Sequence, residues 1–179
     1  MTAGHKIFLV GYTGCGKTSL GRKVAKRLGV RFIDTDAAIE ERENASVSDI
    51  FRYEGEEYFR KAERLLLDDI ANEDIAAIIS TGGGMPVWGG NAERLNESGT
   101  TVYIRRTAEQ IAGRLTPYGR AKRPRLRGLD DGQLVEFMER DIALREPCYA
   151  KAQITLDGSA HSDEELIEEL IKIYNGDEQ

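Results

Sequence analysis

Short apolar runs alternate with longer amphipathic stretches along most of this 179-residue chain. The apolar runs have the length and composition of buried strands, and they fall at residues 7–10, 30–33, 76–80, 101–104 and 153–156. Between them, apolar side chains recur at helical spacing or follow helix-capping residues. The helices predicted in this way lie near residues 19–28, 37–42, 49–53, 56–71, 91–96, 107–115, 131–145 and 162–174.

The ends of several helices carry recognisable signals. Capping boxes are predicted at three helix starts, formed by Ser46 with Asp49, Thr107 with Gln110, and Ser162 with Glu165. Asp130 or Asp131 can cap the helix that runs to Arg145, and Pro147 is expected just beyond its end. Residues 116–128 show no apolar period, so no element is predicted there.

This alternation predicts an α/β fold, with a five-stranded, mostly parallel sheet between helices in a three-layer α/β/α arrangement. Right-handed crossovers place the carboxyl ends of the strands at one edge, where sites in such folds collect. Loops 11–18, 34–36 and 81–84 each follow a strand directly, so we expect them to converge at that edge. The length predicts a single domain over residues 1–179.

The first of these loops carries a phosphate-binding motif. Its residues, GYTGCGKT from Gly11 to Thr18, match G-x-x-x-x-G-K-[ST] between a predicted strand and a predicted helix. Glycines let the backbone N–H groups point at phosphate oxygens, and the helix N-terminus adds its positive dipole. We expect Lys17 to reach the β- and γ-phosphates of ATP and the Thr18 hydroxyl to hold Mg²⁺. The residues predicted to bind ATP here are Gly14, Cys15, Gly16, Lys17, Thr18 and Ser19.

Two aspartates and three glycines follow the next strands. Asp34 is placed to bind Mg²⁺ directly or through water, and Asp36 can face a substrate hydroxyl. The alternative is turn chemistry, since aspartate is common after strands. The consecutive glycines Gly82, Gly83 and Gly84 would let a small ligand approach the backbone, or they form only a tight turn.

Residues 114–127 hold six basic side chains and no acidic one. Phosphoryl transfer needs positive charge on the transferring group and exclusion of water, so this segment predicts a mobile basic lid over about 114–128. A solvated loop that binds nucleic acid is the alternative. Arg60 and Arg145 lie on predicted helices, where each could be a surface charge, but together they could grip an anionic acceptor.

Composition narrows the function classes. The formal net charge of -6 disfavours nucleic-acid binding. The two cysteines lie outside any CxxC pair, so neither a disulfide framework nor a zinc site is indicated. No apolar run reaches membrane-spanning length and the N-terminus has no signal segment, so we expect a cytoplasmic protein with no membrane partner. A monomer is expected, because no long exposed apolar stripe stands out.

Six motifs occur in a fixed order along the chain: GYTGCGKTSLGR, FIDTD, the FR of EEYFRKAE, STGGG, the RP of AKRPRL, and LREPCY. This set resembles the shikimate kinases, which are P-loop kinases of the nucleoside-monophosphate-kinase-like fold, over about residues 7–156. The resemblance implies transfer of the γ-phosphate of ATP to the 3-hydroxyl of shikimate, with Mg²⁺, on the way to chorismate and the aromatic amino acids.

The resemblance also implies a role for individual residues. By this resemblance, Lys17 would hold the ATP phosphates, and Thr18 and Asp34 would bind Mg²⁺. Asp36 would hydrogen-bond the shikimate hydroxyls and is a candidate to accept the proton of the nucleophile. The remaining assignments are the carboxylate pair Arg60 and Arg145, the substrate loop Gly82, Gly83 and Gly84, the lid arginine Arg123 on the transferred phosphate, and Arg114 near adenine or the ATP phosphates. A substrate-binding helical region is expected over about 36–62.

Three other functions remain open from the sequence. A kinase of the same architecture could use another acceptor, such as gluconate or a nucleoside monophosphate, because arginine pairs also bind phosphates. Residues 120–127 could form a nucleic-acid-binding surface. A nucleotide sensor would bind ATP without turning it over.

Overall fold

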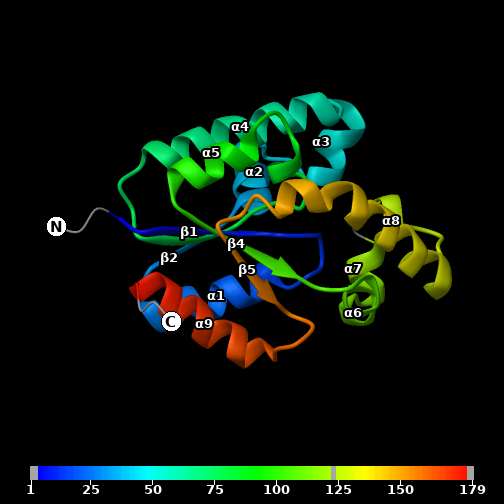
Figure 1. Ribbon diagram of the computed structural model, residues 1–179. Helices are drawn as coiled ribbons and strands as arrows, with labels where there is room; N and C mark the ends of the chain where they lie inside the picture. The colour runs from blue at the N-terminus through cyan, green and yellow to red at the C-terminus, as the bar shows by residue number, and fades with distance from the viewer. Residues whose placement is uncertain (1–3, 122–123, 177–179) are drawn as a thin grey trace.

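A computed structural model describes residues 4–121 and 124–176 of the chain. Its sheet is parallel throughout, with strand order β2-β3-β1-β4-β5 (Figure 1). The strands are β1 (Lys6–Val10), β2 (Arg31–Asp34), β3 (Ala77–Ser80), β4 (Thr100–Arg105) and β5 (Ile154–Asp157). The predicted α/β class and five strands are therefore confirmed, with strand ends shifted by one residue.

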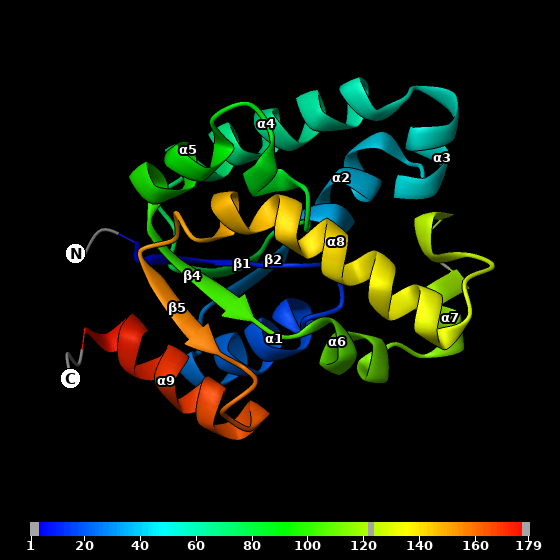
Figure 2. The same ribbon diagram turned by 45° about the vertical axis from the view of Figure 1, so that its right-hand side comes forward.

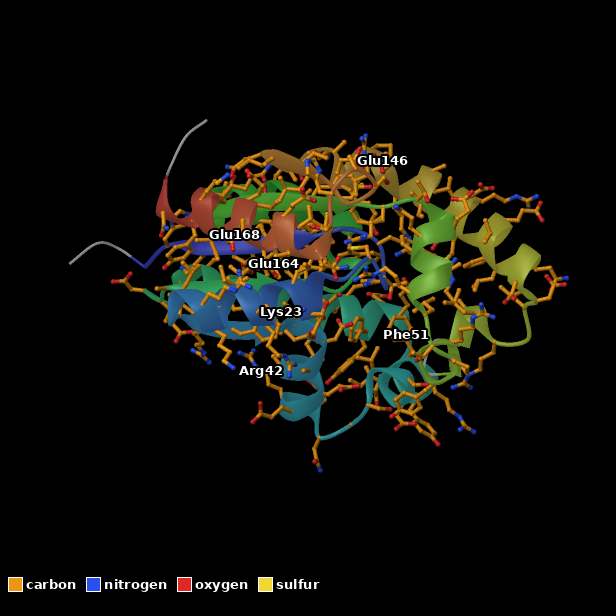
Figure 3. The ribbon with its side chains drawn as sticks, turned by 90° about the horizontal axis from the view of Figure 1, so that it is seen from below. Lys23, Arg42, Phe51, Glu146, Glu164 and Glu168 are labelled. Atoms are coloured by element: carbon orange, nitrogen blue, oxygen red, sulfur yellow. The ribbon has the colours of Figure 1, made fainter. Side chains whose placement is uncertain are left out.

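Helices cover both faces of this sheet (Figure 2). One face carries α1 (Lys17–Leu28) and α9 (Asp163–Asn175), which pack on each other. Figure 3 labels Lys23 on α1, with Glu164 and Glu168 of α9 beside it, and these glutamates form exposed ion pairs with Arg27. The other face carries α2 (Thr35–Glu43), α4 (Glu56–Asn72), α5 (Asn91–Ser98) and α8 (Asp131–Tyr149). The shorter elements are α3 (Val47–Tyr53), η1 (Met85–Val87), α6 (Ala108–Arg114), α7 (Pro117–Ala121) and η2 (Pro124–Leu126).

The core follows the central strands. Every residue of β1 and β3 is buried, because helices cover both faces of a parallel sheet and leave no solvent side. This explains why both strands appear in the sequence as continuous apolar runs rather than as an alternation. Among the described residues, no helix is both long enough and apolar enough to span a bilayer.

The helix caps act largely as their residues predict. Thr107 with Gln110 and Ser162 with Glu165 form complete capping boxes. Asp130 caps α8, where its side chain accepts the backbone N–H of Gln133. At Ser46 the hydroxyl accepts the N–H of Asp49, so α3 begins at Val47, two residues earlier than predicted.

Two predictions about α8 and the segment before it were wrong. The helix does not stop before Pro147 but continues to Tyr149, a fully buried residue. A proline in the last turn removes only one helical hydrogen bond, so tertiary packing of Tyr149 outweighs that loss. Residues 116–128 contain α7 and η2, and Leu126 is buried in the core although no apolar period precedes it.

Candidate active site

The carboxyl ends of β1, β2 and β3 open into one cavity of about 380 Å³. It lies on the side of the sheet where α6 and α7 are drawn in Figure 1. Its lining comes from the three loops predicted to converge and from the segment around α6 and α7: Thr13, Gly14, Gly16, Lys17, Thr18, Ser19, Asp34, Asp36, Ser80, Thr81, Gly82, Gly83, Arg114, Leu115, Thr116 and Gly119. The predicted convergence of the loops is thus present in the structure.

The loop between β1 and α1 curls as a phosphate loop must. Gly14 and Gly16 have φ angles of 83° and 105°, in a region that other residues rarely adopt. Gly16 is the N-cap of α1, so the backbone N–H groups of the first helical turn have no partner within the helix and lie at the end of α1 that borders the cavity. A helix N-terminus with such a loop is a ready site for phosphate groups.

Lys17 is buried at the base of this loop, with 6% of its surface exposed. Its Nζ donates to the carbonyl oxygens of Gly11 at 2.8 Å and Tyr12 at 2.9 Å. These carbonyls hold the ammonium beside the cavity and compensate for its burial. Cys15 is also fully buried, and its Sγ lies 3.8 Å from the same Nζ, so only its backbone can face a ligand in the loop.

Thr18 and Asp34 meet where α1 and β2 face each other. The Thr18 hydroxyl donates to Asp34 Oδ2 at 2.8 Å and lies 3.1 Å from Ser80 Oγ. The other oxygen of Asp34 accepts the N–H groups of Asp36 and Ala37, which caps α2 and orients the carboxylate.

These oxygen ligands fit Mg²⁺, which takes one or two protein oxygens and completes its shell with phosphate and water. Among the described residues, no cluster of three His, Cys, Asp or Glu side chains forms a metal centre made of protein alone. The donor set thus suits an ion that arrives with a nucleotide.

Asp36 projects from the first turn of α2 against the glycine loop. Its Oδ1 is buried and has no hydrogen-bond partner among the described residues. Burial, together with the nearby carboxylate of Asp34, raises the pKa of Asp36 to about 6. A carboxylate that is ionised near neutral pH, has an unpaired oxygen and lines a cavity is suited to accept a proton.

Arg60 and Glu63 form a buried pair one helical turn apart on α4. Arg60 Nη1 donates to Glu63 Oε2 at 2.7 Å, and Arg60 Nη2 reaches Glu56 at 3.0 Å. Glu63 is fully buried, and its second oxygen has no partner among the described residues. Burial raises the pKa of Glu63 to about 7 although Arg60 opposes this shift, and the Asp36 carboxylate adds to it.

The glycine loop leaves just enough room for these groups. A Cβ on Gly82 would lie 2.5 Å from Asp36 Oδ1 and 2.9 Å from Glu63 Oε1, and one on Gly84 would lie 2.7 Å from Arg60 Cζ. Gly83 approaches the phosphate loop, where a Cβ would lie 3.0 Å from the Thr13 nitrogen. The three glycines therefore allow two carboxylates, a guanidinium and the phosphate loop to approach one another closely.

Arg145 reaches the other side of the phosphate loop from α8. Its guanidinium lies 5.7 Å from the Tyr12 ring centre and 3.3 Å from Asp141 Oδ2, which also accepts the Tyr12 hydroxyl at 2.8 Å. Tyr149 OH donates to the Gly83 carbonyl at 2.6 Å. Arg145 is thus held between the phosphate loop and α8, but Arg60, Arg145 and Gly84 are not among the described residues that line the cavity.

Arg114 ends α6 and lines the cavity directly. Its Nη1 and Nη2 donate to the two oxygens of Asp163, at 3.2 and 2.9 Å. The bond from Arg114 holds the pKa of Asp163 below its ordinary value. Arg123, the predicted lid arginine, lies outside the described residues; Arg125, two positions on, pairs with Asp141 at 3.5 Å.

A sequence model of the shikimate kinase family matches residues 13–175 of the chain. The chain belongs to the shikimate kinase family. A shikimate kinase of Parabacteroides distasonis is 45% identical over 153 residues, which is 85% of this chain and 87% of that protein. The crystal structure of shikimate kinase from Bacteroides thetaiotaomicron superposes with a TM-score of 0.86 at 35% identity, over 94% of this chain and 97% of that one.

A second solved structure, shikimate kinase from Acinetobacter baumannii in complex with shikimate, has a TM-score of 0.84 at 28% identity. It covers 98% of this chain and 95% of its own. Agreement over nearly the whole of both chains confirms the P-loop kinase fold and the family that the six motifs indicate.

Three polar residues of this shikimate kinase family member escaped the sequence analysis. Ser80 is the last residue of β3 and ends an apolar run, so its position in the sequence does not distinguish it from an ordinary residue of a buried strand. Glu63 and Asp141 each lie one turn from a predicted arginine, at positions where side chains are buried. A carboxylate three or four residues from Arg60 or Arg145 was the available signal, but the same spacing also occurs in ordinary surface ion pairs.

Proposed function

We propose that this chain transfers the γ-phosphoryl group of ATP to the 3-hydroxyl of shikimate, giving shikimate 3-phosphate and ADP on the route to chorismate and the aromatic amino acids. The observation that carries the proposal is one cavity in which the phosphate loop faces Asp36, a carboxylate with one oxygen left unpaired by the described part of the chain. Membership of the shikimate kinase family and the shikimate complex of the relative from A. baumannii support this choice of acceptor.

The phosphate loop and Lys17 bind the ATP phosphates, and Arg114 approaches them or the adenine from α6. Thr18 and Asp34 would hold Mg²⁺, which would neutralise phosphate charge. Two of the three N–H donors of Lys17 bind the carbonyls of Gly11 and Tyr12. An ammonium held beside the cavity in this way can donate to phosphate oxygens when ATP binds.

Asp36 orients the acceptor hydroxyl and takes its proton. As the hydroxyl oxygen bonds to the γ-phosphorus, the bond from that phosphorus to the bridging oxygen breaks, and ADP leaves with its electrons. The proton passes to the unpaired oxygen of Asp36. A pKa of about 6 keeps this carboxylate ionised at neutral pH while making it a better base than an exposed aspartate.

Arg60 and Arg145 bind the carboxylate of shikimate, and Gly82, Gly83 and Gly84 let its ring approach the backbone. Both guanidiniums are held by carboxylates on their own helices, Glu63 and Asp141, so they are oriented before the substrate arrives. The basic lid over about 114–128, including Arg123, closes over the nucleotide and excludes water, so that ATP is not lost to hydrolysis.

The deciding experiment measures ADP release from Mg·ATP with shikimate, gluconate, nucleoside monophosphates or no acceptor. We expect release that depends on shikimate alone. Release with a nucleoside monophosphate would disprove the assignment of the two arginines to a carboxylate, and release with gluconate would disprove shikimate as the acceptor. Either result would keep the phosphate-loop assignment. If no acceptor stimulates release, only nucleotide binding remains, as in a sensor. Salt-dependent affinity for random DNA or RNA would instead favour a nucleic-acid-binding module.

A further inference from the structure

We infer that Arg106 is a positioning residue for ATP, because its guanidinium holds the phosphate loop so that the Gly16 amide faces the phosphate groups. Arg106 lies between β4 and α6, outside every motif that the sequence analysis singled out. The inference rests on the ATP-binding half of the proposed function and does not depend on the identity of the acceptor.

The guanidinium of Arg106 is buried, with 5% of its side chain exposed, and it joins two loops. Its Nε donates to the Cys15 carbonyl in the phosphate loop at 3.0 Å. Its Nη1 donates to the Gly158 carbonyl, just after β5, at 3.0 Å, and its Nη2 donates to Asp163 Oδ1 at 2.6 Å. Three nitrogens of one rigid fork therefore meet three acceptors, a geometry that lysine cannot reproduce.

The bond to the Cys15 carbonyl fixes the direction of the next amide. A trans peptide is planar, so the C=O of Cys15 and the N–H of Gly16 point in opposite directions. No cis peptide occurs among the described residues, and Gly16 lines the cavity. With the carbonyl drawn toward Arg106, the Gly16 amide is turned away from it, which is the orientation an anion-binding loop requires.

Gly16 needs such a restraint because glycine has more backbone freedom than any other residue. Gly16 has a φ angle of 105° and no side-chain cap. The Ser19 hydroxyl donates to the Gly16 carbonyl at 3.2 Å, but that carbonyl belongs to the next peptide, so this bond does not hold the Cys15–Gly16 peptide as Arg106 does. The hydrogen bond from a buried, charged donor restricts the peptide before ATP binds. The ordering cost of binding is lower as a result.

Gly158 is matched to Arg106 by size. A Cβ at residue 158 would lie 2.9 Å from Arg106 Cγ and Nε and 3.0 Å from Cζ. The backbone N–H of Gly158 also donates to the Arg105 carbonyl at 2.8 Å, which ties this loop to the end of β4. Any side chain at residue 158 would press on Arg106 without removing one of its hydrogen-bond donors.

Asp163 links Arg106 to Arg114, the second arginine at the proposed nucleotide site. Its Oδ1 accepts from both Arg106 and Arg114, and its Oδ2 accepts from Arg114 at 2.9 Å. Arg106 thereby orients the carboxylate that holds Arg114 against the cavity. Two guanidiniums share one carboxylate, so this side of the phosphate loop keeps net positive charge for an incoming phosphate.

The test is Arg106→Gln, with affinities for ATP and for inorganic tripolyphosphate measured without acceptor. We expect both affinities to fall about tenfold, because a charged hydrogen bond to the loop is lost. In steady state the KM for ATP should rise by a similar factor while the KM for shikimate stays within about twofold. Arg106→Lys should recover part of the loss, because it keeps the charge and can reach one of the acceptors.

Two outcomes would overturn the inference. A loss confined to ATP, with tripolyphosphate affinity unchanged, would place the effect at the base rather than at the phosphate loop. Equal rises in both KM values would show a general loss of structure. Arg105→Gln is the matched control, because the guanidinium of Arg105 is half exposed and its ion pair within the described part of the chain is with Asp157 of β5, so both affinities should be unchanged.

If Arg106→Gln does not fold, Gly158→Ala gives the same test, since it displaces the guanidinium and leaves all its donors. We expect it to weaken ATP and tripolyphosphate binding about threefold each, because the added methyl group overpacks the site. Unchanged binding of both would contradict the inference. Because no acceptor is present, a wild-type chain that binds ATP but ignores shikimate would disprove the proposed function and leave this test valid.

Discussion

Two carboxylate side chains at this site are buried in an energetically unfavourable way, each with one oxygen that makes no hydrogen bond to the described residues. Asp36 lines the cavity with a buried oxygen that has no partner within residues 4–121 and 124–176, and Glu63 has another such oxygen beside it. Residues kept in such states cluster at functional sites, because a group that is fully satisfied in the empty protein has little to offer a substrate. This arrangement supports the proposed role of Asp36 as the proton acceptor.

Replacing Asp36 by Asn tests that assignment. We expect kcat to fall by a factor of about 10²–10⁴, the usual contribution of a general base, because the amide cannot take the proton. The affinity for ATP should stay within about twofold, since the phosphate loop is unchanged. Measuring kcat and the Kd for ATP on one preparation separates the two effects. Turnover like that of the wild type would remove Asp36 from the mechanism.

Replacing Gly82 by Ala tests the close approach around the glycine loop. The new methyl group would lie 2.5 Å from Asp36 Oδ1 and 2.9 Å from Glu63 Oε1, so both carboxylates must move. We predict a fall in kcat of at least tenfold with ATP affinity retained. Gly113→Ala is the control, because no atom lies near its Cβ position and the helix gains about 0.5–1 kcal/mol. Equal activity of the two variants would contradict this prediction.

Among the elements, α8 connects the catalytic edge to the core. Arg145 and Asp141 lie on its inner side, and its last turn continues past Pro147 to bury Tyr149 beneath the glycine loop. The helix thus supports both a predicted substrate-binding arginine and the loop opposite it. Its extension beyond the proline is the feature that local sequence signals did not predict.

The contribution of that last turn can be measured with Tyr149→Phe. The variant keeps the buried ring but loses the 2.6 Å hydrogen bond to the Gly83 carbonyl. We expect a loss of about 1–2 kcal/mol in the free energy of unfolding, measured in urea, because a buried acceptor is left unpaired. The KM for shikimate should rise with it, since Gly83 belongs to the proposed substrate loop. An unchanged unfolding midpoint would show that the bond contributes nothing.

For the whole molecule, the parallel order β2-β3-β1-β4-β5 determines where function collects. The sheet brings the loops after β1, β2 and β3 to one edge and aligns α1 with the cavity. The start of β1 and the end of α9 lie on the side of the molecule away from α6 and α7 (Figure 1). The core of the sheet is thus apolar, whereas its carboxyl edge holds buried carboxylates. Because burial disfavours the ionised form of these groups, we expect them to lower the stability of the protein at neutral pH.

That cost gives the stability of the protein a pH dependence. Asp36 has a pKa near 6 when folded and 3.8 as its ordinary value, so the folded state binds the proton more tightly. Its contribution therefore favours folding below pH 4 and is lost as the pH rises through about 6. Compared with the wild type, Asp36→Asn should become more stable by about 2 kcal/mol between pH 4 and pH 8. Urea unfolding of both proteins at the two pH values measures this; a constant difference would contradict it.

Local signals were sufficient for much of this fold. The five strands were predicted because buried parallel strands need unbroken apolar runs, and the capping boxes at Thr107 and Ser162 act at neighbouring residues. The phosphate loop could be predicted for the same reason, since its glycines and Lys17 lie close together within residues 11–17. Asp34, Asp36 and the three glycines followed because parallel strands bring their carboxyl ends together.

Contacts between residues far apart in the sequence could be identified only in the tertiary structure. The Glu63 carboxylate lies beside Asp36 because α4 passes close to Gly82, and Arg106 reaches the Cys15 carbonyl because β4 ends beside the phosphate loop. Likewise α8 passes Pro147 because Tyr149 finds a partner in Gly83. The sequence by itself determined the elements and the loops that carry the phosphate chemistry, since these depend on residues close along the chain. Only the folded chain decided which buried carboxylates and guanidiniums meet, since their energies depend on partners brought together from other elements.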